Sequence, residues 1–286
     1  MIKYLELPGN AFLYPLVIIL NKWLRLRLYF SPSFNRLDKK EDITVVVGVK
    51  DIDSKSLANC LKSIRGQFYD QSLVEIALVD YDSKEESIPL YKELCIKFQV
   101  KYIRVDNRPI WSRSNALNIG IKRAKTKYIL TMDADLIFEN NYIKEVVKEL
   151  KRDPYQLICS QMLDLPDIEI DDKSYEKLKS LAKVRFQSLK FHCSVCATLT
   201  YFYHRIRGYD ERFHTWGCED RDLFIRFVLY GLRPKSIFSR ASYLHQHHEK
   251  FRNVNNYPDF KKSLDANMKY HFTLKPIVRN LAQWGE

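Results

Sequence analysis

The sequence predicts an α/β fold, in which a mainly parallel sheet is flanked by helices, and three observations support this. Strand-like and helix-like segments alternate between residue 43 and about residue 132, with short connections. The strand-like segments are unbroken apolar runs, typical of strands buried on both faces. Acidic residues directly follow several of these runs, where open α/β sheets place their ligands.

The first half of the chain divides into regular elements. Short runs of β-branched and aliphatic residues predict strands at 43–49, 74–79, 100–105 and 128–132. Helices are expected at 54–65, 85–98 and 114–125. In the first of these, Leu57, Leu61 and Ile64 recur at three- and four-residue spacings, which places them on one helical face. Alternation of this kind predicts a doubly wound sheet.

The regularity weakens after about residue 150. There the pattern predicts a helix over 174–190, a strand over 195–203 and a helix over 218–230. We expect three parts: an N-terminal segment at 1–41, a first half of the domain at 42–150, and a second half at 151–286 built onto the same sheet.

The chain has 286 residues and a formal net charge of +12, which favours an anionic partner. A nucleotide diphosphate and an acidic membrane surface are the leading candidates. No aromatic RNA-binding signature and no zinc-finger spacing is present, so nucleic acid is not expected. The six cysteines show no disulfide framework, and reduced thiols in the cytoplasm are the expectation. Cys193 and Cys196 could form half of a zinc site, but ordinary buried thiols are favoured.

The N-terminal segment combines two compositions. Residues 11–20 are strongly apolar but too short to span a membrane. Residues 22–30 mix basic, aromatic and apolar side chains, as in segments that lie on an anionic bilayer. Two interpretations stay open: a peripheral contact with the inner face of the membrane, or packing against the protein itself or a second subunit.

Asp133 and Asp135 end the apolar run at 128–132, with only Ala134 between them. Two carboxylates at a strand end suit a divalent cation such as Mn²⁺ or Mg²⁺, and through it a diphosphate. The alternative is that the pair caps a turn. Asp51 and Asp80 follow other predicted strands, which supports a nucleotide site. Neither GxGxxG nor a P-loop is present, so phosphate binding would depend on metal and basic side chains.

A second group of candidates begins at Trp216 and Gly217, directly before Glu219 and Asp220. Acidic residues in a first helical turn stabilise the helix dipole, which is one explanation. An exposed aromatic ring beside a carboxylate also suits a sugar, whose hydroxyl the carboxylate could deprotonate. Farther along, the chain concentrates three histidines, one of which could complete a metal site with Asp135: His245, His247 and His248.

These residues together resemble metal-dependent GT-A glycosyltransferases of the family-2 type that carry a galactosyltransferase-like C-terminal motif. The resemblance covers about residues 42–250. It rests on Val47–Asp51, Val79–Ser83, Trp111–Gly120, the DxD Asp133–Asp135, and the block from Gly208 to Leu223 that includes WGxEDxDL.

The resemblance implies transfer of a sugar from a UDP-sugar to an acceptor hydroxyl on a saccharide or lipid-linked glycan. The donor side would comprise Val49, Asp51, Asp80 (at the uracil), Arg113, Asp133, Ala134 and Asp135. The metal would be held by Asp135, Asp133 and His245, with His247 and His248 as competitors. Asp220 would be the base of an inverting displacement, assisted by Glu219, and Trp216, Gly217 and Glu219 would shape the acceptor pocket.

Two positions depart from the family pattern: Asp82, where glycine is frequent, and Ile52, where arginine is frequent. Two other functions were weighed. In a DxD phosphatase Asp133 would be the nucleophile, but that motif normally follows the first strand of a domain. The other is a non-catalytic, membrane-associated UDP-binding protein of the same fold, and the intact carboxylates at 133, 135, 219 and 220 argue against this loss of activity.

Overall fold

The computed structural model describes residues 40–171, 173–185, 192–248, 258–273 and 275–286, together with Ile19, Trp23 and Leu26. The predicted membrane-interfacial segment at 1–41 therefore lies almost wholly outside the described residues. Within the described part of the chain, no helix has the length and apolar character needed to cross a membrane.

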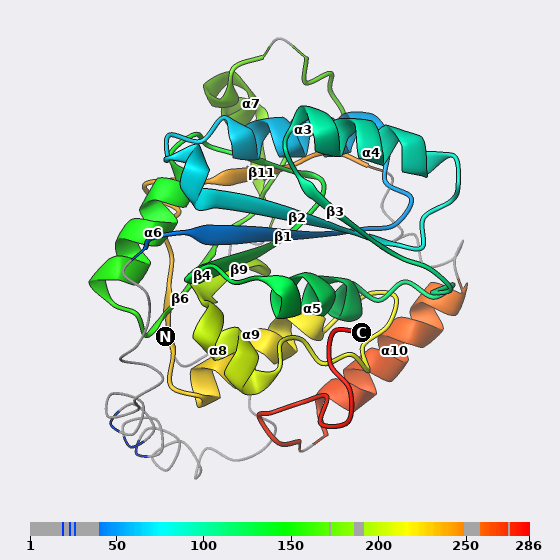
Figure 1. Cartoon of the computed structure of the whole chain (residues 1–286), viewed down its shortest axis with the longest axis vertical. Coiled ribbons are helices and arrows are strands. Elements are labelled where there is room, and N and C mark those ends of the chain that lie inside the picture. The colour runs from blue at the N-terminus through cyan, green and yellow to red at the C-terminus, as the bar shows by residue number, and fades with distance from the viewer. Residues whose placement is uncertain are drawn as a thin grey trace.

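A seven-stranded sheet forms the centre of the molecule, in the order β10-β6-β9-β4-β1-β2-β3 (Figure 1). All neighbouring pairs are parallel except the two that involve β9, which is antiparallel to β4 and β6. The mainly parallel α/β fold is thus confirmed. The strands are β1 Ile43–Val49, β2 Val74–Tyr81, β3 Lys101–Val105, β4 Tyr128–Asp133, β6 Gln156–Ser160, β9 His192–Leu199 and β10 Arg233–Lys235.

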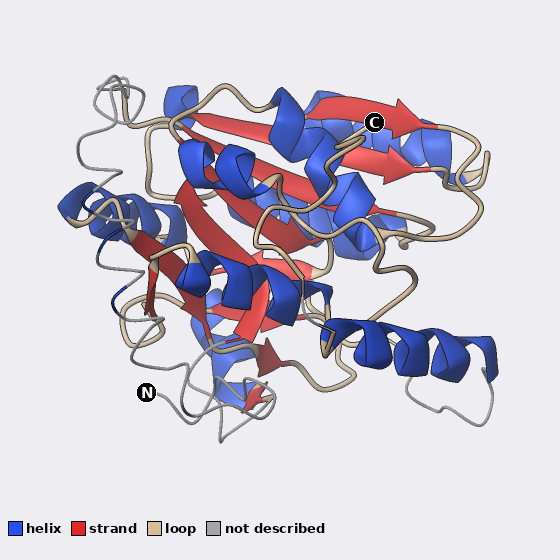
Figure 2. Cartoon of the chain, turned by 90° about the horizontal axis from the view of Figure 1, so that it is seen from below, coloured by secondary structure: helices blue, strands red, loops and turns tan. Residues whose placement is uncertain are grey.

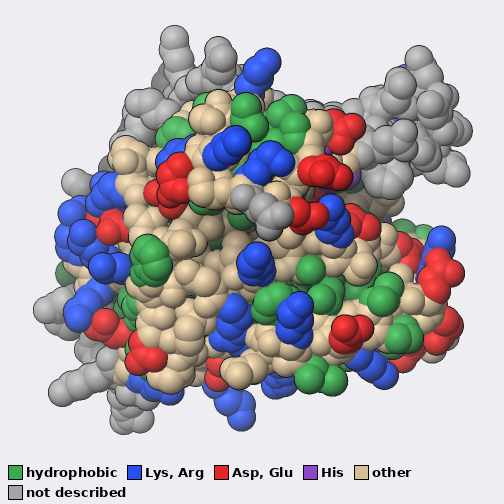
Figure 3. All heavy atoms as spheres, turned by 90° about the horizontal axis from the view of Figure 1, so that it is seen from above, with side chains coloured by type: hydrophobic (Ala, Val, Ile, Leu, Met, Phe, Trp, Pro, Cys, Tyr) green, Lys and Arg blue, Asp and Glu red, His purple; other side chains and the backbone are tan. Residues whose placement is uncertain are grey.

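Helices cover both faces of this sheet. Figure 1 shows α3 and α4 on one face and α5, α8 and α9 on the other. The helices are α3 Ser54–Arg65, α4 Ser87–Lys97, α5 Arg113–Arg123, α6 Tyr142–Arg152, α7 Tyr175–Leu181, α8 Thr200–Ile206, α9 Glu219–Leu229 and α10 Pro258–His271, with a short 3₁₀ helix η2 at Gln71–Leu73. One end of α10 extends beyond the body of the molecule (Figure 2). Basic side chains, mixed with acidic ones, are spread over the face seen from above (Figure 3).

A smaller sheet of four short strands lies beside the main one, in the order β5-β11-β7-β8. Its strands are β5 Leu136–Phe138, β11 Tyr243–His245, β7 Leu163–Asp164 and β8 Lys183–Val184. β5 begins directly after Asp135 and pairs antiparallel with β11. The small sheet therefore brings His245 back to the DxD motif from more than a hundred residues away.

Two predicted elements were wrong in part. The helix expected over 174–190 ends at Leu181, because Ala182 is extended and the next residues form β8 against β7. The strand expected over 195–203 ends at Leu199, and the aromatic run after it is helix α8. Helical spacing buries Phe202, Tyr203 and Ile206 together, so tertiary packing outweighs the strand preference of aromatic residues.

Candidate functional site

The carboxyl ends of three parallel strands meet at one edge of the main sheet. The register pairs Val49 with Asp80 and Gly48 with Asp133. The predicted row of strand ends therefore exists at one edge of the sheet, and donor binding there stays a prediction. Val49 and Ala134 are only 2% and 5% exposed, so at this edge they offer backbone rather than side chain.

Asp80 is fully buried, and its carboxylate is occupied by protein donors. Its oxygens accept hydrogen bonds from the Ser83 amide at 3.0 Å, the Tyr102 hydroxyl at 2.5 Å and Arg104 at 2.8 Å. Burial favours the neutral acid, but these hydrogen bonds outweigh it and lower the pKa of Asp80. In this arrangement Asp80 connects the end of β2 to Ser83 in the following turn and to Tyr102 and Arg104 on β3. The contact of Asp80 with uracil stays a prediction.

Lys50 is a residue of this edge that the sequence reasoning missed. Its ammonium donates hydrogen bonds to the carbonyl oxygens of Asp82 and Arg108 at 2.7 and 2.9 Å, which ties the end of β1 to the loop before α5. Asp82 has a φ of +60°, which explains why glycine is frequent at this position. Asp51 is exposed, with a φ of +54°, and accepts a hydrogen bond from the Lys84 amide. For Lys50, the signal available in the sequence was its position directly after the buried strand at 43–49.

Arg113 connects the two candidate groups found in the sequence. Its Nε donates to Asp133 and its Nη1 to Asp220, each at 2.5 Å, and its Nη2 donates to the Ser194 carbonyl at 2.8 Å. Arg113 is the first residue of α5, whose N-cap Ser112 accepts a hydrogen bond from the Asn115 amide. The end of β4 and the first turn of α9 therefore face each other across one guanidinium. We call Asp133, Arg113 and Asp220 the strand-edge cluster.

Glu219 and Asp220 open α9, as predicted. The Asp220 side chain is 25% exposed, whereas Glu219 is only 7% exposed. Burial raises the pKa of Asp220 well above its ordinary value; Arg113 opposes this shift, and the Glu219 and Asp133 carboxylates add to it. Burial likewise raises the pKa of Glu219. A carboxylate with a raised pKa accepts a proton more readily near neutral pH, which suits a general base.

Trp216 stands directly before this turn and is 45% exposed. Its ring lies 5.5 Å from that of Phe260, and its carbonyl accepts a hydrogen bond from Asn267, both on α10. Gly217 has a φ of +103°, and a Cβ there would lie 2.7 Å from Leu264. α10 therefore supports an exposed aromatic ring four residues before Asp220 in the chain, and Gly217 permits the turn between them.

Asp135 lies together with two histidines. The Nε2 atoms of His245 and His248 are each 3.3 Å from Asp135 Oδ2, and the three potential ligand atoms lie within 4.8 Å of one another. Asp135 Oδ1 is buried and has no hydrogen-bond partner among the residues that the structure describes, so a cation would satisfy an otherwise costly group. The structure does not bring Asp133 or His247 into this group: Asp133 pairs with Arg113, and His247 lies 3.6 Å from Asp167.

In the metal-free site His245 would hold a proton at neutral pH. Burial disfavours protonation of His245, but its hydrogen bonds with Asp135 and Asp164 outweigh burial and raise the pKa of His245 to about 9. A metal cation bound through His245 Nε2 would therefore displace a proton from the ring. Two imidazoles with one carboxylate fit Mn²⁺ better than Mg²⁺, which prefers oxygen ligands. The residues present therefore fit the metal that the resemblance implies.

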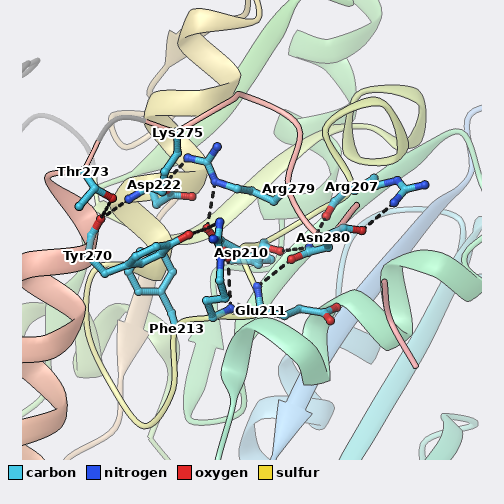
Figure 4. A network of polar contacts seen from close by, with 12 residues as sticks. Arg207, Asp210, Glu211, Phe213, Asp222, Tyr270, Thr273, Lys275, Arg279 and Asn280 are labelled. Carbon is cyan, nitrogen blue, oxygen red and sulfur yellow. Dashed lines mark hydrogen bonds and ion pairs between the residues drawn. The ribbon is translucent and has the colours of Figure 1, made fainter. Parts of the chain in front are cut away.

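A second cluster, which the sequence reasoning also missed, holds the other side of α9. Arg279 donates to Asp210 at 2.9 Å and to Asp222 at 3.2 Å, while Tyr270 donates to Asp210 at 2.7 Å (Figure 4). Asp222 also accepts from Arg226. We call Asp210, Asp222 and Arg279 the tail cluster, because it attaches the C-terminal segment to α9.

Two protein-family models match this chain, and two curated proteins are similar to parts of it. The model described as glycosyl transferase family 2 matches residues 44–206, more than half of the chain, and the model described as the N-terminal domain of galactosyltransferase matches residues 177–259. The chain is 29% identical over 132 residues to a poly-beta-1,6-N-acetyl-D-glucosamine synthase of Staphylococcus aureus, which covers 46% of this chain and 30% of the synthase. It is 22% identical over 205 residues to a hyaluronan synthase of Pasteurella multocida, covering 59% and 21%. The matches thus span less than a third of these curated relatives.

Solved structures give the same result for the fold. TarS 1–349 of S. aureus in complex with UDP-GlcNAc superposes with a TM-score of 0.56 at 14% identity, covering 78% of this chain and 64% of that one. The complex of TarS 1–349 with UDP gives 0.55 at 13% identity, covering 79% and 65%. This likeness is one of fold, and it confirms the predicted GT-A architecture. With the family model matched over more than half of its residues, the chain belongs to glycosyl transferase family 2.

Proposed function

We propose that this chain transfers a sugar from a UDP-sugar to a hydroxyl of a saccharide or lipid-linked glycan acceptor, with inversion at the anomeric carbon. The observation that carries the proposal is the Arg113 bridge. It joins Asp133 at the donor edge to Asp220 at the start of α9, at 2.5 Å on each side. In a transferase, the donor nucleotide and the base that activates the acceptor must lie next to each other, and one arginine side chain separates the two carboxylates here.

The donor is proposed from the relatives. TarS was crystallised with UDP-GlcNAc, and a curated relative is named as an N-acetylglucosamine polymer synthase. UDP-GlcNAc is therefore the first donor to test. Asp51 and Arg113 lie at the strand ends where the nucleotide would bind, and the Lys50 ammonium adds positive charge to that edge.

Asp135, His245 and His248 would hold a Mn²⁺ ion. When bound, the cation would neutralise negative charge that develops on the departing diphosphate. The chain's own contribution is to place these ligand atoms together. The short strands β5 and β11 bring His245 to Asp135, since their register pairs His245 with Leu136, the neighbour of Asp135, and His248 follows three residues after β11 ends.

Asp220 would take the proton from the acceptor hydroxyl as that hydroxyl attacks the anomeric carbon. The raised pKa of Asp220 suits this task, and the buried Glu219 beside it helps to maintain the shift. Arg113 holds one oxygen of Asp220, so the carboxylate has a fixed orientation. Trp216 would support one face of the acceptor sugar. Attack from the side opposite the leaving group inverts the configuration.

The location of the enzyme is also a proposal. The composition of the N-terminal segment and the net charge of +12 support a peripheral position on an anionic inner membrane surface. Deleting residues 1–30 is expected to abolish co-sedimentation with anionic vesicles. Sedimentation that survives the deletion would show that this segment is not the membrane contact.

Turnover of a UDP-sugar panel tests the proposed activity. Purified protein is incubated with each donor and with oligosaccharide acceptors, in Mn²⁺ or in EDTA, and both UDP release and product mass are measured. We expect acceptor-dependent UDP release that requires Mn²⁺ and is lost in Asp135→Ala. Phosphate release from monoesters would instead indicate a phosphatase, and UDP binding without turnover of any donor would indicate a binding protein.

A further inference from the structure

Four polar residues form a row across the small sheet, two carboxylates alternating with an imidazole and a guanidinium, with one residue on or next to each strand. Asp135 precedes β5, His245 ends β11, Asp164 ends β7 and Arg185 follows β8 directly. The register pairs His245 with Asp164 on neighbouring strands. The row therefore starts at the proposed metal site and runs away from it through the sheet.

The contacts along the row are direct. His245 Nδ1 lies 3.2 Å from Asp164 Oδ1, on the side of the ring opposite the Nε2 that faces Asp135. Arg185 Nε lies 2.9 and 3.0 Å from the two oxygens of Asp164, and Arg185 Nη2 lies 2.5 Å from Oδ1. The side chains of His245, Arg185 and Asp164 are only 9%, 12% and 21% exposed, so packing limits their movement.

We propose that Asp164 is a positioning residue for the metal ligand His245, and that Arg185 holds Asp164 in place for this role. This inference rests on the metal site of the proposed function. When His245 Nδ1–H donates to Asp164, the other nitrogen, Nε2, keeps its lone pair toward Asp135 and the cation. A carboxylate behind a histidine ligand fixes both the tautomer and the ring orientation.

The geometry separates this role from that of a direct ligand. Asp164 contacts the wrong nitrogen of His245 to share an ion with Nε2, and the group of potential ligand atoms around Asp135 does not include it. Its oxygens are also engaged by Arg185. The backbone adds a further constraint, because the Arg185 amide donates to the Met162 carbonyl at 3.0 Å and so joins the ends of the β7–β8 pair.

The test is a Mn²⁺ titration of the full chain, with and without UDP. The electron paramagnetic resonance signal of free Mn²⁺ measures how much of the ion stays unbound. We expect Asp164→Ala to weaken Mn²⁺ binding about 10- to 100-fold. Asp164→Asn keeps an acceptor for Nδ1–H and is expected to lose less. The matched control is Asp167→Ala: this carboxylate lies 3.6 Å from His247, is 90% exposed, and should change the affinity less than about twofold.

A second measurement reports which ring nitrogen of His245 carries the proton. In ¹⁵N spectra of the histidine side chains with diamagnetic Zn²⁺, which accepts imidazole ligands, we expect His245 of the wild type to carry its proton on Nδ1, and Asp164→Asn to keep that tautomer. Mn²⁺ binding and tautomer that are unchanged in Asp164→Ala would overturn the inference while leaving the metal site intact. A wild-type chain that binds no Mn²⁺ would overturn both.

Discussion

The strand-edge cluster and the tail cluster meet the same turn of α9 and use the same residue types, but they differ in access to solvent. In the strand-edge cluster the two aspartate side chains are 31% and 25% exposed. In the tail cluster they are 0% and 5% exposed. One arginine joins two carboxylates in each case, so composition alone does not distinguish a reactive site from a structural one.

The pKa directions differ as well. Burial and neighbouring carboxylates raise the pKa of Asp220 despite Arg113. At Asp210, burial is outweighed by hydrogen bonds from Arg212 and Tyr270, and the pKa is lowered. The first carboxylate is therefore costly to keep ionised and ready to accept a proton, whereas the second is stable as an anion. A partly exposed cluster whose carboxylate has a raised pKa fits the proposed catalytic role of Asp220, and a buried cluster whose carboxylate has a lowered pKa fits structural support.

The largest expected effect is on turnover at the strand-edge cluster. Asp220→Asn removes the proposed base and should lower kcat about 10²- to 10⁴-fold. The free energy of unfolding at neutral pH should be unchanged or higher, because an acid whose folded pKa is raised destabilises the fold when ionised. Steady-state kinetics and guanidinium unfolding measure the two quantities. A kcat within tenfold of the wild type would remove Asp220 from the reaction.

Disrupting the tail cluster should instead affect the free energy of unfolding. Arg279→Ala removes the buried cation that Asp210 and Asp222 share and leaves Asp222 with Arg226 and Asp210 with Tyr270 and Arg212. It should lower the free energy of unfolding by up to about 3–5 kcal/mol. Arg212→Ala is the matched control, since Arg212 also pairs with Asp210 but is 60% exposed, and should cost less than about 1 kcal/mol. Denaturant unfolding compares the two, and equal losses would contradict the distinction between buried and exposed pairs.

Because the folded pKa of Asp210 is lowered, its contribution to stability has a defined pH range. The contribution is fully present above the unfolded pKa of an aspartate, about 3.9, and is lost as pH falls through the lower folded value. Tyr270→Phe removes one of the hydrogen bonds that lower this pKa, so the difference in unfolding free energy between wild type and Tyr270→Phe should shrink in acid.

A smaller effect is expected at the aromatic surface next to the strand-edge cluster. Trp216→Ala should raise the acceptor KM about tenfold, equivalent to about 1.4 kcal/mol, because the ring is proposed to support the acceptor sugar. The donor KM should not change, and Trp216→Phe should retain most of the affinity. Initial rates with varied acceptor and varied donor separate the two constants. An equal rise in the donor KM would place Trp216 on the nucleotide side.

The smallest expected effect is a shift in the pH profile. Activity needs ionised Asp220, so kcat/KM falls as pH falls through the pKa of Asp220, which is above the ordinary range. Glu219→Gln removes one of the charges that raise this pKa, and the acid limb should move to lower pH. A limb that moves to higher pH would show that Glu219 does not act on Asp220 through its charge.

The sequence predicted those parts of the fold that depend on local pattern. β1 and α3 have the expected bounds, because buried β-branched runs and helical spacing are local signals. The strand-end aspartates lie along one edge for a topological reason: parallel neighbours end on the same side. The DxD motif, His245 and the first turn of α9 could thus be proposed together from the chain alone.

Other features could not be predicted, because they depend on contacts between distant segments. Arg279 reaches Asp210 across 69 residues, and nothing near either residue marks the pairing. The two-residue strands β7 and β8 are too short for periodicity to show, so the pairing of Asp164 with His245 was not visible. Asp80 looked like an available carboxylate because sequence does not show that Tyr102 and Arg104 occupy it.

The most direct test of the account is a calorimetric titration of UDP into the full chain, with Mn²⁺ and with EDTA. It is repeated on Asp135→Ala at the proposed metal site and, as a control, on Arg212→Ala, which removes the exposed arginine that pairs with Asp210 of the tail cluster. The account predicts UDP binding that requires Mn²⁺, is lost in Asp135→Ala and is unchanged in Arg212→Ala. UDP binding of equal strength in EDTA, or in Asp135→Ala, would contradict the claim that this strand edge is a metal-dependent donor site.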